Sequence, residues 1–148
     1  MKIINLKNNM VYLKDYIYLR NTYSDCLLTK KVTKNKTKQW LKTHQVDIFI
    51  AILKEEVVGA IIIYYEKNNE ITIFTKYKNK GIGSKLLFYI LNKAKFNKYD
   101  LWAWIEQNNV LSYKLFKKFG FIKIKDFEKE FKGMNFNGYI LKKFFKSD

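Results

Sequence analysis

A basic, glycine-containing turn between a strand-like run and an amphipathic helix is the segment best suited to chemistry. It reads IFTKYKNKGIGSKLL over residues 73–87. The first turn of a helix leaves backbone N–H groups unpaired, and the helix dipole adds about half a positive charge there, so an anion is stabilised at that end. Gly81 and Gly83 carry no Cβ that would hold a phosphate away from those amides. Three lysines surround the turn with positive charge: Lys78, Lys80 and Lys85. The turn therefore predicts a pyrophosphate site.

Two common phosphate-binding motifs do not fit this segment. A Walker loop needs four residues between its first glycine and the closing Gly-Lys-Ser/Thr, and the stretch lacks them. A dinucleotide fingerprint needs a third glycine where Leu86 stands, followed by a βαβ unit with an acidic residue, which is not apparent. Because many helices begin after glycines for packing reasons, a purely structural role for the turn stays open at this point.

The same segment closely resembles the acetyl-CoA-binding motif of the GNAT superfamily of N-acetyltransferases, which is Arg or Gln, two residues, Gly, one residue, and Gly or Ala. Residues 78–83 read KNKGIG, with Lys in place of Arg. A second family motif, N-x-x-A-x-x-L-Y-x-x-x-G-F, is similar to NVLSYKLFKKFGF at residues 109–121. The resemblance runs from about residue 47 to the C-terminus, while the first helices fit more loosely. It implies acetyl-CoA as the cofactor.

In this superfamily the strand before the phosphate turn parts from its neighbour. The resemblance implies that its free backbone receives the pantetheine arm and the thioester carbonyl, which a backbone N–H would polarise as an amine attacks. The implied cofactor-binding residues are Ile73, Phe74, Thr75, Lys78, Lys80, Gly81, Ile82, Gly83, Ser84, Asn109, Ser112 and Phe116. Because transfer in the family is direct, Cys26 is not an acyl carrier, and we expect it to be a small buried residue.

Two positions near the expected reacting centre depart from the family pattern. Phe116 replaces the tyrosine that often protonates the leaving thiolate. Trp104 stands where some relatives, ribosomal-protein acetyltransferases among them, carry a catalytic carboxylate. Ser112 lies one turn before Phe116 on the same helical face, so it is a candidate to hydrogen-bond the sulfur or a water. Ordered water could accept the amine proton, and the side-chain candidates for a general base are, in order, Glu106, Glu70 and His44.

Arg20 is the only arginine among 29 basic residues. A guanidinium can hold a phosphate or carboxylate through two hydrogen bonds, which an ammonium cannot. Residues 18–42 are similar to the stretch in GNAT members that acetylate amino sugars on nucleotide carriers, where Arg-Asn follows the first helix and Trp-Leu marks the second. The predicted acceptor-binding residues are Arg20, Trp40 and Trp104, of which the tryptophans offer stacking surfaces. A surface ion pair for Arg20 and core packing for the tryptophans remain alternatives.

The elements that must position these residues follow from the apolar periodicity. Strands are expected over residues 2–6, 47–53, 57–65, 71–75 and 100–106, with two more within 121–145. Helices are expected over residues 11–21, 37–44, 81–96 and 109–119. This order is typical of a mixed α/β domain. With the resemblance it predicts a single GNAT-like domain over residues 1–148, in which about four helices pack on a mostly antiparallel twisted sheet of about six or seven strands, splayed at the cofactor site.

Composition narrows the range of partners. The 148 residues include 29 basic and 13 acidic side chains, for a net charge of +16, and 48% are apolar, which suffices for a core. The charge favours a polyanionic partner. However, the bias towards Lys, Asn, Ile, Tyr and Phe without proline is what an AT-rich coding genome produces, so we expect no nucleic-acid partner. One Cys, one His and the lack of a long apolar run predict no disulfide, no metal cluster and no membrane span, hence a cytoplasmic protein.

Together these observations predict an N-acetyltransferase that moves an acetyl group from acetyl-CoA by direct attack of a primary amine. The expected acceptor is a nucleotide-linked amino sugar or another small amine, and a homodimer is possible. Alternatives within enzymes are a protein N-terminal, ribosomal-protein or polyamine acetyltransferase. Because Phe116 and Trp104 depart from the pattern, a CoA-binding protein without turnover is a further alternative. A basic nucleic-acid-binding module is the third class, and its binding would weaken steeply with salt.

Overall fold

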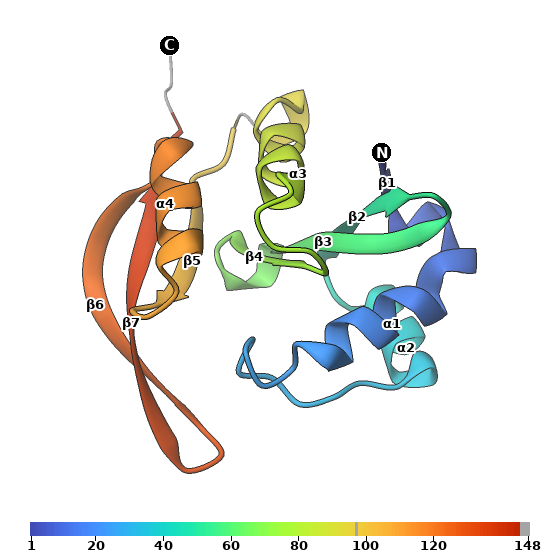
Figure 1. The fold of residues 1–148 in the computed structure, drawn as a ribbon, viewed down its shortest axis with the longest axis horizontal. Coiled ribbons are helices and arrows are strands. Elements are labelled where there is room, and N and C mark those ends of the chain that lie inside the picture. Colours follow the sequence, from blue (N-terminus) through green and yellow to red (C-terminus); the bar gives the residue numbers. More distant parts are fainter. Residues whose placement is uncertain (97, 146–148) are drawn as a thin grey trace.

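The computed structural model describes residues 1–96 and 98–145, and its strands form one sheet in the order β1-β2-β3-β4-β5-β7-β6 (Figure 1). The strands are β1 (Lys2–Asn5), β2 (Val46–Leu53), β3 (Glu56–Tyr64), β4 (Glu70–Thr75), β5 (Leu101–Glu106), β6 (Ile122–Phe131) and β7 (Met134–Lys143). Neighbouring strands are antiparallel except β4 and β5, which are parallel. The predicted fold class, a mostly antiparallel sheet of about seven strands with helices packed on it, is confirmed.

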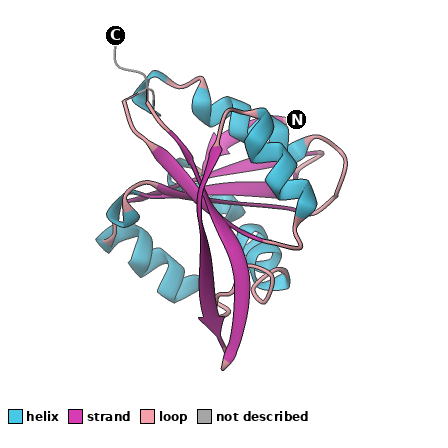
Figure 2. Cartoon of the chain, turned by 90° about the vertical axis from the view of Figure 1, so that its left-hand side faces the viewer, coloured by secondary structure: helices cyan, strands magenta, loops and turns pink. Residues whose placement is uncertain are grey.

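Helices cover both faces of this sheet (Figure 2). They are α1 (Leu13–Thr22), α2 (Lys34–Thr43), α3 (Ile82–Leu91) and α4 (Val110–Lys118). Side chains of α1 and α2, such as Tyr16 and Leu41, join one buried cluster, and side chains of α3 and α4, such as Leu86 and Phe116, join the other. The described part of the chain contains no helix that is both long and apolar enough to cross a membrane.

The element order agrees with the sequence prediction, but several boundaries were wrong. Helix α3 ends at Leu91 rather than near residue 96, because the Asn92 side chain donates to the Phe88 carbonyl at 2.8 Å and closes the helix. A short 3₁₀ turn follows at Ala94–Phe96. Helix α2 begins at Lys34 instead of residue 37, because the Thr33 hydroxyl accepts the N–H of Lys36 at 3.3 Å and caps it.

The sheet opens between β4 and β5. Among the described residues these two strands share a single register pair, Glu70 with Trp102, and the Trp102 N–H reaches the Asn69 carbonyl at 3.4 Å. By contrast, β3 and β4 remain paired through Thr75, and β5 and β7 through Glu106. The parallel strands therefore meet at one end and part towards their carboxyl ends, which confirms the predicted splay.

A long hairpin borders one side of this opening. Strands β6 and β7 pair along their whole length and extend beyond the rest of the sheet towards the loop that follows α1 (Figure 1). At the hairpin tip, Lys132 Nζ lies 3.0 Å from Asp25 Oδ1 of that loop, and both side chains are exposed. The face of the sheet that carries α1 is thus flanked by the hairpin and by the segment between α1 and α2.

Candidate active site

The predicted phosphate turn forms the N-terminus of α3. Gly81 is the N-cap residue, with φ +74° and ψ 8°, a left-handed conformation that favours glycine. A Cβ at this position would meet nothing within 4 Å, so the space above the turn is open. The first helical bond runs from the Lys85 N–H to the Gly81 carbonyl at 3.0 Å. The N–H groups of residues 82–84 precede that bond and have no carbonyl within the helix to pair with.

Gly83 has a different role from Gly81. A Cβ on Gly83 would lie 3.1 Å from Leu115 Cδ2 and 3.9 Å from methyl groups of Ile73 and Thr75. Gly83 therefore lets α3 approach α4 and β4 closely. The prediction that both glycines clear space for a phosphate needs this correction, because only Gly81 borders open space. Ile82 is buried in the core with 4% exposure, so it offers only its backbone N–H to a ligand.

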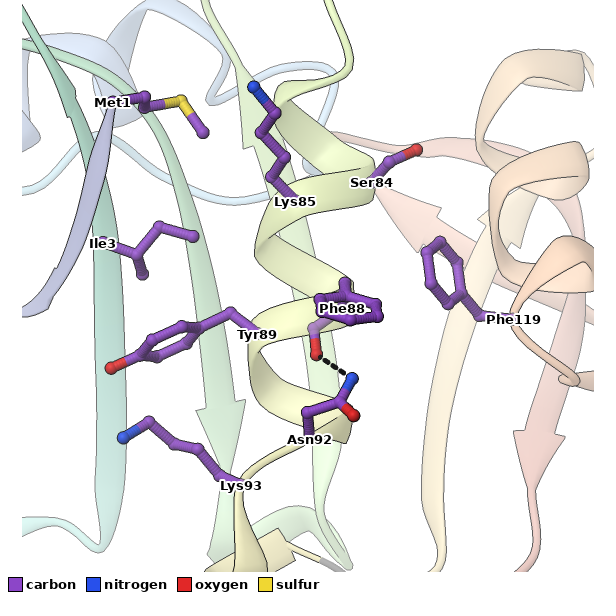
Figure 3. A pocket seen from close by; sticks show the side chains of 9 residues that line it. All are labelled: Met1, Ile3, Ser84, Lys85, Phe88, Tyr89, Asn92, Lys93 and Phe119. Atoms are coloured by element: carbon purple, nitrogen blue, oxygen red, sulfur yellow. Dashed lines mark hydrogen bonds between the residues drawn. The ribbon is translucent and has the colours of Figure 1, made fainter.

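Positive charge and a groove continue from this turn. The three lysines of the turn, Lys78, Lys80 and Lys85, are exposed, and none is in an ion pair within the described ranges. A groove of about 650 Å³ begins at Ser84 and Lys85. Phe88 of α3 and Phe119, which follows α4, border it (Figure 3). Aromatic rings beside lysines suit the nucleotide part of a coenzyme.

Strand β4 turns alternate backbone groups towards β5. The Lys76 N–H bonds to Val58 of β3, whereas the Asn69 carbonyl accepts from Trp102 of β5. Because hydrogen-bonding direction alternates along a strand, Ile73 and Thr75 direct their N–H groups into the opening and Phe74 does not. The Phe74 ring is buried on the α1 face, with its centroid 6.1 Å from that of Tyr16. Of the three β4 residues predicted to bind the cofactor, Ile73 and Thr75 direct backbone N–H groups into the opening, while the Phe74 ring packs under α1; binding of the cofactor by these residues stays a prediction.

The second motif places α4 beside the opening. Asn109 caps this helix, since its Oδ1 accepts the Ser112 N–H at 3.1 Å. Phe116 is 2% exposed and packs edge-to-face on Phe121, with 5.0 Å between ring centroids. Asn109 and Phe116 therefore hold α4 in place. The Phe116 ring has no proton to donate. Ser112 is half-buried in the first turn, and its role towards the sulfur stays a prediction.

Strand β5 borders the opening on the side away from β4. One face of β5 carries Trp102, Trp104 and Glu106, which are half-buried and alternate with buried residues. The Trp104 indole N–H donates to the Phe127 carbonyl at 2.8 Å. A Cβ at Gly138 would collide with the indole, so the Trp104 ring packs directly against Gly138 of β7. Trp104 is thus fixed by the hairpin. Glu106 ends β5 opposite Gly138 at the wide end of the opening, and its role as a general base stays a prediction.

The remaining predicted acceptor residues, Arg20 and Trp40, lie on the α1 face, where each contacts other groups of the protein. Arg20 Nη1 donates to the Lys30 carbonyl at 3.2 Å. Burial raises the pKa of the Tyr64 hydroxyl, and the nearby Arg20 guanidinium partly offsets this rise. Trp40 packs against Tyr64 and His44, with ring centroids 6.0 and 5.8 Å apart. His44 is exposed at the end of α2, where Nδ1 lies near the Trp40 carbonyl.

Cys26 is exposed in the loop after α1, so the expectation that it is buried was wrong. The physical reason is its place in a turn that runs over the surface, where a small apolar side chain finds no core to join.

A carboxylate–lysine pair lies at the narrow end of the opening, and the sequence pointed to only one of its two residues. Glu70 is 8% exposed, and its Oε2 lies 3.8 Å from Nζ of Lys129 on β6. The same Nζ lies 4.8 Å from the centroid of the Trp104 ring. Burial lowers the pKa of Lys129, an effect that the Glu70 charge partly offsets. Glu70 was a candidate base, but Lys129 carried no local signal, because its neighbours come from strands distant in the chain.

Comparisons with known proteins agree with this geometry. The model of the Acetyltransferase (GNAT) family matches residues 14–121. None of the curated proteins matches the chain in sequence. The fold is similar to that of a ribosomal-protein-alanine N-acetyltransferase from Brucella melitensis, with a TM-score of 0.84, 18% identity and coverage of 97% of this chain and 99% of that one.

Two further solved structures share the fold. An N-acetyltransferase from Staphylococcus aureus Mu50 has a TM-score of 0.84 and 22% identity, with 98% of each chain covered. An acetyltransferase structure from Salmonella typhimurium with its cofactor acetyl-CoA has a TM-score of 0.78 and 17% identity, and the match covers 99% of this chain and 95% of that one.

Proposed function

The chain belongs to the GNAT acetyltransferase family, whose members use acetyl-CoA, and on this premise we propose that it acetylates the primary amine of a small acceptor, specifically a nucleotide-linked amino sugar. The observation that carries the proposal is that two features are joined by one short turn. The open N-terminus of α3 follows the short turn after β4, and beyond the Glu70–Trp102 pair the described backbone of β4 has no register partner on β5. A diphosphate site and a slot for an extended acyl arm are therefore continuous.

Acetyl-CoA, when bound, supplies an acetyl group activated as a thioester. The N–H groups of residues 82–84 would bind its diphosphate, assisted by the exposed lysines of the turn. The groove beyond Ser84 would hold the nucleotide part. The Ile73 N–H, fixed in β4 and directed into the opening, would stabilise negative charge on an acyl oxygen. These residues bind, orient and polarise, and none of them forms a covalent bond with the acyl group.

The acceptor would enter from the α1 face, between the hairpin and the segment after α1. This entrance carries three cationic side chains, of which Lys129 and Lys132 pair with Glu70 and Asp25. The Arg20 guanidinium, which is in no ion pair among the described residues, supports an acceptor with a phosphate group. Proton removal from the amine falls to Glu106 at the wide end or Glu70 at the narrow end. The thiolate leaves without help from Phe116, and coenzyme A is a tolerable leaving group, so we expect slow turnover.

Two measurements test the proposal. Acetyl-CoA should raise the melting temperature, because a ligand that binds only the folded chain stabilises it. Thiol release should then be followed with a panel of UDP- and dTDP-linked 4-amino sugars, a peptide with a free N-terminal alanine, and spermidine. Release with the nucleotide sugars alone supports the proposal. Release with the peptide alone would indicate a protein N-terminal acetyltransferase, and thermal stabilisation without any release would indicate a coenzyme-binding protein without turnover.

A further inference from the structure

The ammonium group of Lys129 lies on the face of the sheet that carries α1, close to side chains of both β4 and β5. One of its neighbours, Glu70, belongs to β4, and the other, the Trp104 ring, belongs to β5. Glu70 forms, with Trp102, the one register pair that the described residues of the two strands share, and Trp104 lies two residues beyond Trp102, where the strands have already parted. A single nitrogen near side chains of both strands therefore lies at the edge of the opening, on the face from which an acceptor amine would approach.

The two neighbours of Lys129 form a site for a primary ammonium. Glu70 is a nearly buried carboxylate that can accept a proton, and the Trp104 ring offers an aromatic face to a cation. Trp104 is itself held by the Phe127 carbonyl and by Gly138, so this face is already in place. An amine on an acceptor would need the same two contacts, and Lys129 makes them within the chain.

Lys129 also differs from the lysines of the outer surface. Its side chain is 35% exposed, compared with 65% for Lys132 at the tip of the same hairpin. Burial lowers the pKa of Lys129. A larger share of Lys129 is therefore in the neutral, nucleophilic form near pH 8 than for an exposed lysine.

We propose that Lys129 is an acetylation site of this protein, whose Nζ accepts the acetyl group of acetyl-CoA bound to the same chain when no external amine is present. The proposal rests on the transfer chemistry of the preceding subsection. Glu70 takes one proton from the ammonium, and the freed nitrogen lone pair forms a bond to the acyl carbon. The C–S bond breaks and its electron pair leaves with the sulfur. The products are Nε-acetyl-lysine, the thiol form of coenzyme A and one proton released to water.

The test is to incubate the purified full chain with acetyl-CoA at pH 8 without an amine and to map acetylated lysines by mass spectrometry over time. We expect Lys129 to be acetylated at least tenfold faster than Lys132, to approach one acetyl group per chain, and to do so at a rate independent of protein concentration. The variant Glu70→Gln should slow Lys129 acetylation at least tenfold. Lys129→Arg keeps the cation and should abolish the fast phase, whereas the matched control Lys125→Arg, at an exposed position of the same strand, should retain it.

A second acyl donor separates positioning from simple reactivity. S-acetyl-N-acetylcysteamine carries the same thioester but no nucleotide, so it should modify lysines in order of exposure, with Lys132 before Lys129. If Lys129 is acetylated no faster than Lys132 with acetyl-CoA, or if both donors give the same order, the inference is wrong. If acetyl-CoA stabilises the chain and supports thiol release with an amine while Lys129 stays unmodified, only this inference fails. Absence of both stabilisation and release would instead remove the proposed function.

An NMR measurement on the chain without coenzyme checks the position of the Lys129 side chain. In the reductively ¹³C-methylated chain, the Lys129 signal, assigned with Lys129→Arg, should lie apart from those of exposed lysines because the Trp104 ring shields it, and it should move in Glu70→Gln. A Lys129 signal that coincides with the exposed lysines would contradict the placement on which the proposal depends.

Discussion

Glu70 and Trp102 form the register pair at which β4 and β5 join, and in the described part of the chain these strands have no second one. All the other neighbouring strands run side by side for at least four register pairs. The sheet therefore consists of two well-paired halves that meet at one point. This narrow junction leaves backbone groups of β4 free in the middle of the domain, where a buried strand would otherwise be fully paired.

The two glycines of the phosphate turn should respond differently to substitution. Gly83→Val places methyl groups against Leu115, which is already 3.1 Å from an ideal Cβ, so it should abolish the acetyl-CoA-induced rise in melting temperature. Gly81→Ala meets no protein atom and strains the left-handed backbone at about 1 kcal/mol of unfolding free energy, but its Cβ occupies the open space in which the diphosphate would bind. It should therefore reduce the acetyl-CoA-induced rise while costing the free chain less stability than Gly83→Val does. A Gly81→Ala variant that keeps the full rise, or that destabilises the free chain as much as Gly83→Val, would contradict these assigned roles.

Restoring a hydroxyl at position 116 should speed turnover. Phe116→Tyr supplies a proton donor at the position where the GNAT pattern has its tyrosine, and proton transfer of this kind is commonly worth about 10²-fold or more in rate. We expect kcat to rise at least about tenfold with little change in acetyl-CoA affinity. Because Phe116 is 2% exposed, an unpaired hydroxyl would also lower the unfolding free energy by about 1–3 kcal/mol. An unchanged kcat in a variant that binds acetyl-CoA normally would show that thiolate protonation does not limit the reaction.

The Trp104 indole should matter for the acceptor and not for the coenzyme. Gly138→Ala adds a Cβ that collides with this ring and displaces it from the Phe127 carbonyl, at a cost of about 1–3 kcal/mol in unfolding free energy. The KM for the acceptor should rise severalfold, while acetyl-CoA stabilises the variant as it does the parent. Asn135→Ala, at an exposed position of the same strand, is the matched control. A loss of acetyl-CoA binding in Gly138→Ala would place Trp104 on the coenzyme side instead.

Stability at acid pH should depend on Asp47. Burial raises the pKa of this carboxyl, but hydrogen bonds from Lys95 at 2.8 Å and Tyr65 at 2.6 Å, together with the charges of Lys95 and Lys7, bring it below its ordinary value of 3.8. The folded chain therefore holds this proton more weakly than the unfolded chain. The stabilisation is complete above about pH 4 and is lost as the pH falls through the lower pKa of the folded state.

Asp47→Asn removes that titration and should lower the unfolding free energy at pH 7 by about 1–3 kcal/mol. The difference from the parent should shrink as the pH falls below 4, which urea unfolding at pH 7, 4 and 3 can measure. A difference that stays constant over this range would show that Asp47 contributes nothing through its charge.

Much of the fold was predictable from periodicity and from two motifs in register. The alternation of Trp102, Trp104 and Glu106 with buried residues identified β5 and its half-buried face, and the spacing of Leu86 and Ile90 identified α3. Helix ends were less predictable, because single side chains such as Thr33 and Asn92 set them through hydrogen bonds to the backbone. The local pattern of apolar residues shows which face of a helix or strand is buried. The end of a helix depends instead on the conformation of a single capping side chain.

The coenzyme half of the site was also more predictable than the acceptor half. The phosphate turn is local, so its residues lie together in the chain and in space. Lys129 reaches Glu70 only because β6 follows β7 in the sheet order and the hairpin folds over β5. In the same way, the contact of Arg20 with the Lys30 carbonyl depends on the path of the segment after α1. Such contacts arise from tertiary arrangement, which residue spacing does not encode.

The proposed function depends above all on main-chain amides at the start of α3 that bind the diphosphate of the coenzyme. Backbone ¹⁵N–¹H NMR of the labelled chain during titration with acetyl-CoA tests it directly. We expect the amides of Ile82, Gly83 and Ser84 to shift most strongly, to move downfield as is usual for hydrogen bonds to a phosphate, and to exchange more slowly with solvent. Saturating acetyl-CoA that leaves these three amides unshifted, or that shifts only residues remote from the turn, would contradict it.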